Sequence, residues 1–131
     1  ALRKQLLPVF DKYGVDVVIT GHDHYFMRSE PMTSNGATQY TAEKIAEDSA
    51  EIKMFSDIKT GTIYFMNGSA GVKQHAGKLY EIDKIYIDES YTTDLPTYSY
   101  CTVTENNIIF KTYSVSGSGE SRLIDAWGIR K

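Results

Sequence analysis

Apolar residues near the start of the chain recur every three or four positions, which predicts a helix of about three turns. The helix is expected to end at Gly14, because glycine readily adopts the backbone conformation that follows a helix. Pro8 falls inside this pattern and predicts either a kink or a late start. The apolar positions of the pattern are Leu2, Leu6, Val9, Phe10 and Tyr13.

The segment that follows Gly14 is apolar nearly throughout. Residues 15–20 therefore predict a strand covered on both faces in a parallel or mixed sheet. A helix, a short glycine turn and a buried strand form half of an α/β repeat. In such repeats the functional turn lies at the carboxyl end of the strand.

Further strands are predicted downstream from alternating apolar positions and from turn residues. Pro31 is expected to end the first of them, and the second runs into the glycine-rich turn at residues 68–71. A hairpin around Asn106-Asn107 and a closing strand complete the set. The predicted strands cover residues 25–30, 61–66, 98–104, 108–115 and 123–129.

Two segments are predicted to be long surface insertions, because their apolar residues are scattered among charged and polar ones. They cover residues 33–57 and 72–97. The first insertion is expected to contain one helical turn near residues 42–50. The whole of residues 1–131 is predicted to form a single domain, with these two segments at its surface.

Composition narrows the class of protein. A chain of 131 residues is long enough for one domain with a core. The net charge of -3 gives no basic surface for nucleic acid, and no stretch approaches the ~20 apolar residues of a membrane span. The single cysteine, Cys101, is expected to be a small buried apolar group.

The chemistry is concentrated in Gly21-His22-Asp23-His24, at the end of the predicted strand. Two imidazoles, two residues apart on a turn, can direct two nitrogen ligands at a metal centre from a rigid base. A bare His-x-His pair is also compatible with two solvated histidines. Both readings stay open on these four residues alone.

The residues around this turn resemble a known family. Residues 6–24 are similar to the last metal-binding motif of the calcineurin-like metallophosphoesterases, particularly the purple acid phosphatase-like branch. Residues 61–71 resemble the next strand and its Gly-Ser-Ala-Gly turn, and residues 123–131 resemble the closing strand. The family's Asp-x-His, Gly-Asp and Gly-Asn-His motifs do not occur in this sequence.

The resemblance implies an α+β fold, the C-terminal part of an αββα sandwich, mostly β with one N-terminal helix and long insertions. It implies that the chain is a C-terminal fragment of the domain, whose N-terminal half is a partner absent from this sequence. It also implies hydrolysis of phosphate mono- or diesters at a binuclear metal centre in the full-length enzyme. Export from the cell is expected from the resemblance alone.

Carried over position by position, the resemblance makes His22 a ligand of one metal ion and His24 a ligand of the other. The two ions would be divalent or trivalent iron, zinc or manganese. We expect this chain alone to bind metal weakly or not at all and to be inactive. Asp23 is expected to stabilise the turn, Phe26 to pack in the core and Arg28 to form a structural ion pair.

Two alternatives from other classes remain. One is a β-rich binding module in which the histidine pair is incidental. The other is self-association as a homodimer through an uncovered sheet face or strand edge. The ten tyrosines are expected to fill a β-rich core and cover a sheet face, and His75, with Lys73 and Lys78, is expected to lie on a solvated loop.

Overall fold

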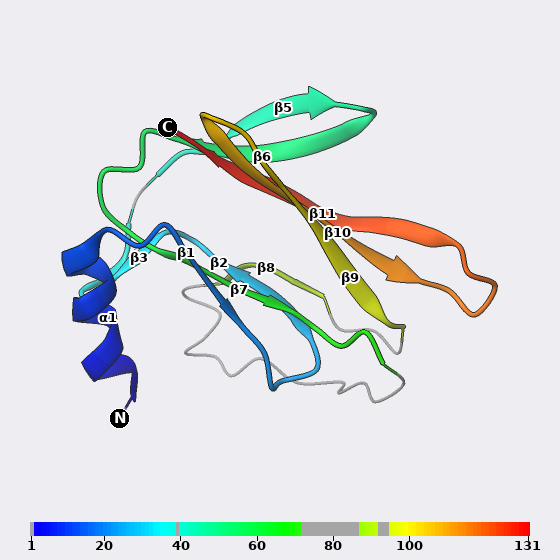
Figure 1. Cartoon of the computed structure of the whole chain (residues 1–131), viewed down its shortest axis with the longest axis horizontal. Coiled ribbons are helices and arrows are strands. Elements are labelled where there is room, and N and C mark those ends of the chain that lie inside the picture. The colour runs from blue at the N-terminus through cyan, green and yellow to red at the C-terminus, as the bar shows by residue number, and fades with distance from the viewer. Residues whose placement is uncertain (1, 39, 72–86, 92–94) are drawn as a thin grey trace.

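The computed structural model describes residues 2–38, 40–71, 87–91 and 95–131. One helix and eleven strands lie in this part of the chain (Figure 1). The helix is α1 (Leu2–Tyr13), and the strands are β1 (Val17–Thr20), β2 (Phe26–Ser29), β3 (Met32–Thr33), β4 (Gly36–Ala37), β5 (Glu43–Glu47), β6 (Ala50–Ser56), β7 (Ile63–Asn67), β8 (Ile87–Tyr91), β9 (Thr97–Val103), β10 (Asn107–Val115) and β11 (Ser121–Arg130).

Two sheets face each other, and α1 lies on the outer side of one of them (Figure 1). The four-stranded sheet has the order β1-β7-β2-β8, and the five-stranded sheet has the order β5-β6-β11-β10-β9. Strands β3 and β4 form a small separate pair. The described part is therefore mostly β with one helix, as predicted, whereas the second helical layer of an αββα sandwich is not seen among the described residues.

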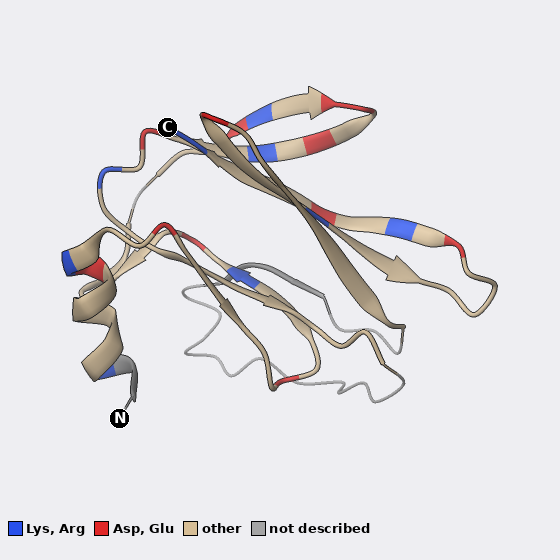
Figure 2. Ribbon diagram, viewed as in Figure 1, with Lys and Arg blue, Asp and Glu red and all other residues tan. Residues whose placement is uncertain are grey.

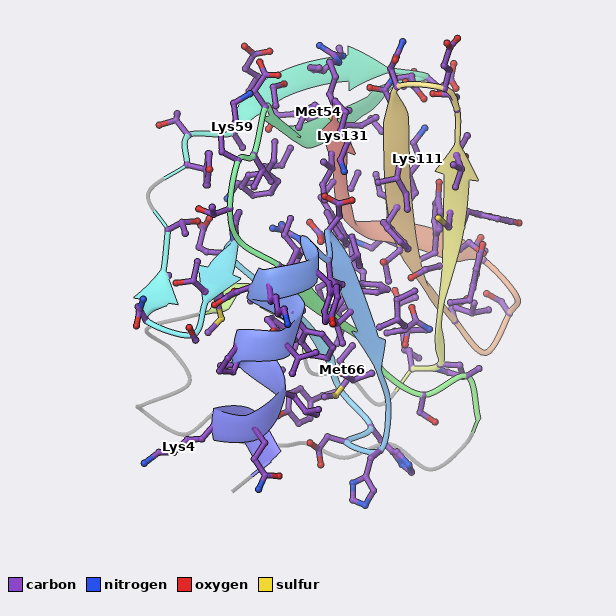
Figure 3. The ribbon with its side chains drawn as sticks, turned by 60° about the vertical axis from the view of Figure 1, so that its left-hand side comes forward. Lys4, Met54, Lys59, Met66, Lys111 and Lys131 are labelled. Carbon is purple, nitrogen blue, oxygen red and sulfur yellow. The ribbon has the colours of Figure 1, made fainter. Side chains whose placement is uncertain are left out.

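The predicted helix is confirmed, and it begins at Leu2 with Pro8 inside it, so Pro8 does not mark a late start. The helix packs through Phe10, whose ring centroid lies 6.3 Å from that of Tyr64 on β7. Met66 shares the face of Tyr64, because residues two apart on a strand point the same way, and it too lies on the helix side (Figure 3).

Strand β1 pairs in parallel with β7, as expected for this segment. It is not covered on both faces, because β1 is the edge strand of its sheet and Ile19 is 64% exposed. The continuous apolar run indicated burial but could not reveal which strand would lie at the edge.

An aromatic cluster joins the two sheets. Phe65 of β7 lies between the sheets, with ring centroids 5.8 Å from Phe26, 5.2 Å from Phe110 and 5.7 Å from Trp127. Phe110 and Trp127 stack at 4.7 Å on adjacent strands β10 and β11. Large rings in edge and stacked contacts add to the free energy of burying their surface. Phe26 therefore packs in the core, as predicted.

The prediction for residues 33–57 is wrong. Residues 42–50 contain no helical turn, and β5 and β6 form a hairpin that joins the five-stranded sheet through parallel pairing of β6 with β11. Ile52, Met54 and Phe55 are fully buried, so this segment supplies core residues. Lysine and glutamate residues lie along both strands of the hairpin (Figure 2), and this density of charge is what makes the segment resemble a surface insertion in the sequence.

The prediction that residues 72–97 are loop-like is also wrong in part. Residues 87–91 form β8, which pairs with β2, and Thr97 begins β9. The remainder, residues 72–86 and 92–94, lies outside the described residues, and so do His75, Lys73 and Lys78.

The C-terminal predictions are confirmed. Strands β9 and β10 form the expected hairpin, and β11 pairs antiparallel with β10. Cys101 is exposed, contrary to expectation, because it lies in the outer half of the edge strand β9. Residual desolvation raises the pKa of the Cys101 thiol, so it stays protonated at neutral pH. No helix in the described residues is long and apolar enough to cross a membrane.

The place of β6 in the core can be tested with Ile52, which is 0% exposed. We expect Ile52→Ala to lower the free energy of unfolding by about 2 to 5 kcal/mol, because it leaves a cavity in a packed site. Urea denaturation measures this loss. Val103→Ala, at an exposed position, serves as the control and should change the value by less than about 0.5 kcal/mol. Equal effects of the two substitutions would contradict the buried position of β6.

Candidate metal centre

The histidine turn connects β1 to β2 across the carboxyl end of β7. Thr20, the last residue of β1, is paired with Met66, and Phe26, the first residue of β2, is paired with Asn67. Both flanking strands are thus hydrogen-bonded to the same central strand. The turn at residues 21–25 therefore has a short span between two fixed ends, which suits a ligand-bearing turn.

His22 is exposed and has an unusual backbone conformation. Its φ of 91° lies in a region that non-glycine residues rarely adopt. Its side chain is 95% exposed, and its Nδ1 lies 3.4 Å from Oδ1 of Asp23. Such strain is typical of functional sites, where the surrounding structure holds a residue in place.

His24 lies closer to the protein body. The residue is half-buried, and its Nδ1 atom is buried. The two histidines therefore differ in environment: the ring of His22 is open to solvent, and the ring of His24 is held against the fold. The turn could present one accessible and one constrained imidazole to a ligand.

The two histidines of the turn form only part of a metal-ligand set. Neutral imidazole suits zinc, iron, nickel and copper, so two histidines fit as part of a ligand set. Among the described residues there is no group of three or more His, Cys, Asp or Glu side chains that could hold a metal ion. The turn thus offers two nitrogen donors, and a complete site requires further ligands.

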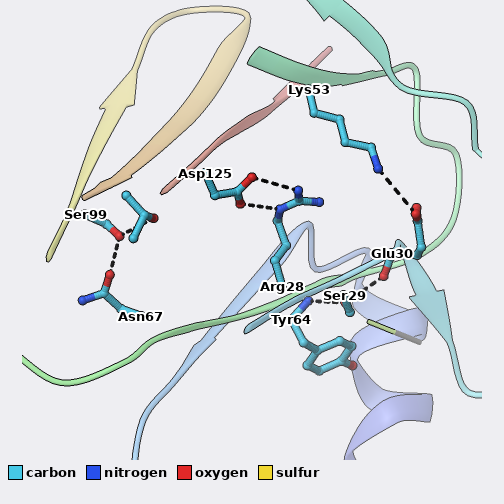
Figure 4. A network of polar contacts seen from close by, with 9 residues as sticks. Arg28, Ser29, Glu30, Lys53, Tyr64, Asn67, Ser99 and Asp125 are labelled. Carbon is cyan, nitrogen blue, oxygen red and sulfur yellow. Dashed lines mark hydrogen bonds and ion pairs between the residues drawn. The ribbon is translucent and has the colours of Figure 1, made fainter. Parts of the chain in front are cut away.

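A buried ion pair supports the strand that leaves the turn. Arg28 of β2 donates from Nε to Oδ2 of Asp125 at 2.8 Å and from Nη2 to Oδ1 at 3.1 Å (Figure 4). The side chains are 0% and 8% exposed. The guanidinium also lies 5.6 Å from the ring of Trp127. The predicted structural role of Arg28 is confirmed, while its partner on β11 was not foreseen.

The same region contains a cleft of about 410 Å³, lined by Arg28 of β2 and otherwise by residues of β5, β6 and β11 and by Ala42. Arg28, Lys44 and Lys53 line it, and each pairs with a carboxylate. The carboxylates of Asp125 and Glu51 also lie in the lining. The histidine turn does not belong to this lining, so the cleft is separate from the candidate metal centre.

The glycine-rich turn after β7 packs against the histidine turn. Gly68 has a φ of 86°, and a Cβ atom there would lie 3.4 Å from the backbone of both Tyr25 and Phe26. The chain leaving His24 is therefore in close contact with this second turn.

The chain is similar in sequence to part of two longer proteins. No protein-family model matches it. Over 78 residues it is 32% identical to uncharacterized proteins from two strains of Mycobacterium tuberculosis, a match that covers 60% of this chain. The chain spans 14% of the length of these relatives.

The fold is similar to that of the purple acid phosphatase isolated from yellow lupin (Lupinus luteus) seeds. The TM-score is 0.61 at 16% sequence identity, and the match covers 95% of this chain and 19% of the lupin protein. The chain shares its fold with part of a purple acid phosphatase. The resemblance seen in the sequence is thus confirmed at the level of the fold, while the roles of His22 and His24 stay predictions.

The importance of the buried ion pair can be tested by replacing its members singly and together. We expect Arg28→Met to lower the free energy of unfolding by about 3 to 5 kcal/mol, because Asp125 is left as an unpaired buried charge. The double variant Arg28→Met/Asp125→Leu should recover most of that loss. Urea denaturation of the unchanged chain, Arg28→Met, Asp125→Leu and the double variant measures these values and shows whether the two single losses add. An additive loss in the double variant would contradict direct pairing.

Proposed function

We propose that this chain is part of a metal-dependent phosphoesterase and contributes His22 and His24 to its binuclear metal centre. The observation that carries the proposal is the place of the two histidines. They lie on the turn at the carboxyl end of β1, within a fold that matches part of a purple acid phosphatase over 95% of the chain. Ligands in α/β folds are typically bound at that end of the strands.

In this proposal each histidine holds one ion through a neutral ring nitrogen. The exposed ring of His22 is accessible to a ligand, and the half-buried ring of His24 is restrained by the fold. Asp23 lies beside Nδ1 of His22 and orients that ring. When bound, a metal pair of this kind activates water and neutralises charge on a phosphate ester.

The proposed substrates are phosphate mono- or diesters, and the proposed ions are iron, zinc or manganese. The remaining ligands would come from residues outside this sequence, in the N-terminal half of the domain. We therefore expect the 131-residue chain alone to bind metal weakly and to hydrolyse no phosphate ester. Export of the full-length protein is proposed on the family resemblance alone.

A second candidate function, self-association, is favoured by a specific feature of the surface. Ile19 is exposed on the edge strand β1, and Leu6, Val9 and Tyr13 are exposed on α1. An apolar strand edge can pair with a second copy of the chain.

Zinc titration followed by NMR of the histidine ring signals tests the first proposal. In the 131-residue chain, which lacks the remaining ligands of the two-ion centre, we expect the two imidazoles to share one zinc ion. His22→Ala and His24→Ala should therefore each weaken zinc binding at least about tenfold, because each leaves a single imidazole. His75→Ala removes the third histidine of the chain and should leave the dissociation constant unchanged. Zinc binding that survives loss of both His22 and His24 would contradict the proposal.

The same samples can be assayed with a phosphate monoester and added iron, zinc or manganese. No hydrolysis by the 131-residue chain is expected. Turnover that is lost in His22→Ala and His24→Ala would show that the chain alone completes a catalytic site, contrary to our expectation.

Size-exclusion chromatography with light scattering tests self-association. If the β1 edge pairs with a second copy, the mass will be twice the 14.8 kDa of the monomer, and Ile19→Glu will restore the monomer. Val103→Glu places the same charge at another exposed apolar position and serves as the control. A monomer at every concentration would rule out this candidate.

A further inference from the structure

The backbone that leaves the histidine turn rests on the end of β7. Phe26, two residues after His24, is paired with Asn67 in the sheet. Gly68, which follows Asn67, has a positive φ, and its backbone lies close to the backbone of Tyr25 and Phe26. On the other side of the turn, the Thr20 hydroxyl donates to the Phe65 carbonyl at 3.5 Å. Both ends of the histidine turn therefore depend on where the last residues of β7 lie.

Thr97, the first residue of β9, holds that end of β7 from the opposite sheet. Its hydroxyl donates to the carbonyl oxygen of Asn67 at 2.7 Å, and its backbone N–H donates to the carbonyl oxygen of Ser69 at 2.9 Å. The Asn67 side chain donates back to the Thr97 carbonyl at 3.5 Å. Thr97 is 3% exposed, so these bonds are shielded from water.

The Thr97 side chain packs directly against the backbone of Gly68. A Cβ atom on Gly68 would lie 2.5 Å from the Thr97 hydroxyl oxygen. The hydroxyl thus occupies the space next to Gly68 that any other residue would need. Gly68 therefore contacts Thr97 of β9 on one side and the backbone of Tyr25 and Phe26, which follow His24, on the other.

Two further hydroxyl groups extend this contact into the five-stranded sheet. The Ser99 hydroxyl donates to Oδ1 of Asn67 (Figure 4), and it lies 2.7 Å from the hydroxyl oxygen of the buried Thr112 on β10. Ser99 and Thr112 are paired across β9 and β10. The side chain of Asn67, at the end of β7, is therefore hydrogen-bonded to Ser99 of β9 and, through Ser99, connected to Thr112 of β10.

We propose that Thr97 is a positioning residue for the histidine turn. It touches neither imidazole, and it acts by fixing Asn67 and Gly68, on which the backbone following His24 rests. The inference depends on the proposed function, because it assigns Thr97 a role in the metal affinity of His22 and His24. Residues that orient ligands from outside the ligand set commonly influence metal affinity.

Two matched substitutions distinguish an effect of Thr97 on the position of the histidine turn from an effect on the stability of the whole fold. Thr62 is also buried, at 1% exposure, and its hydroxyl donates to the Val15 carbonyl at the same 2.7 Å, but it precedes β7 and lies at the opposite end of the strand. Thr97→Val and Thr62→Val therefore remove the same kind of bond in nearly isosteric changes. Comparable decreases in the urea midpoint are expected.

Only Thr97→Val is expected to weaken zinc binding, by at least about fivefold, the lower range for coupling between separate sites. Thr97→Ser keeps the hydroxyl and should stay within about twofold of the unchanged chain. NMR of the His22 and His24 ring signals gives the dissociation constants. Hydrogen exchange of the amides of residues 21–24 gives a readout without metal, and it should be faster in Thr97→Val than in Thr62→Val.

The outcomes distinguish this inference from the proposed function. Equal zinc affinities and equal amide exchange rates in the two valine variants would overturn the role of Thr97. Zinc binding that does not depend on His22 and His24 would contradict the proposed function and would remove the role of Thr97 in metal affinity with it. If Thr97→Val does not fold, Ser99→Ala removes the other hydroxyl that holds Asn67, through its Oδ1, and leaves the Thr97 hydroxyl in place. Weaker zinc binding in Ser99→Ala than in Thr62→Val would then support anchoring of the turn through Asn67, and equal zinc affinities would contradict it.

Discussion

The buried ion pair between Arg28 and Asp125 is the interaction on which the arrangement of the two sheets depends. Burying either charge alone would be costly, so the two strands that carry them can occupy the interior only together. The bidentate geometry fixes both the distance and the register of β2 against β11. The rings of Phe65, Phe110 and Trp127 then fill the space beside the pair.

This core explains how an exposed histidine turn can have a defined shape. Arg28 is only four residues beyond His24, so the strand leaving the turn is anchored almost at once. Thr97 secures the neighbouring end of β7 from the five-stranded sheet. The strained φ of His22 is compatible with such support, because a loosely held turn would relax. The chemistry is local in sequence, but its support comes from both sheets.

The sequence predicted those features that depend on local patterns. Helical spacing located α1, and alternation around Asn106-Asn107 located the β9–β10 hairpin. The β5–β6 hairpin was missed because its many charged residues are typical of a surface insertion, although Glu51 and Lys53 alternate with the buried Ile52 and Met54. Its sheet partner β11 also lies far along the chain. Cys101 was misplaced for a related reason: alternation identifies a strand but not whether the strand lies at an edge.

In the candidate site, too, local sequence patterns predict some residues, while others depend on partners far along the chain. The His22–His24 pair is visible in four consecutive residues, and the family resemblance of its flanks makes the two histidines predicted ligands. The ion pair of Arg28 is predicted without its partner. Asp125 is 97 residues away, and no local pattern connects the two. Thr97 is likewise recognisable only once the sheets are placed against each other. Ligand candidates could be predicted from the sequence, while the residues that hold them in position could not.

The most direct test of the central claim is an anomalous difference map from crystals of this chain grown with zinc. The account predicts a zinc ion bound to a ring nitrogen of His22, of His24, or of both at about 2.0 to 2.1 Å, with the turn at residues 21–25 in the conformation described above. Zinc found only at other residues, with both histidine rings directed into solvent, would contradict it.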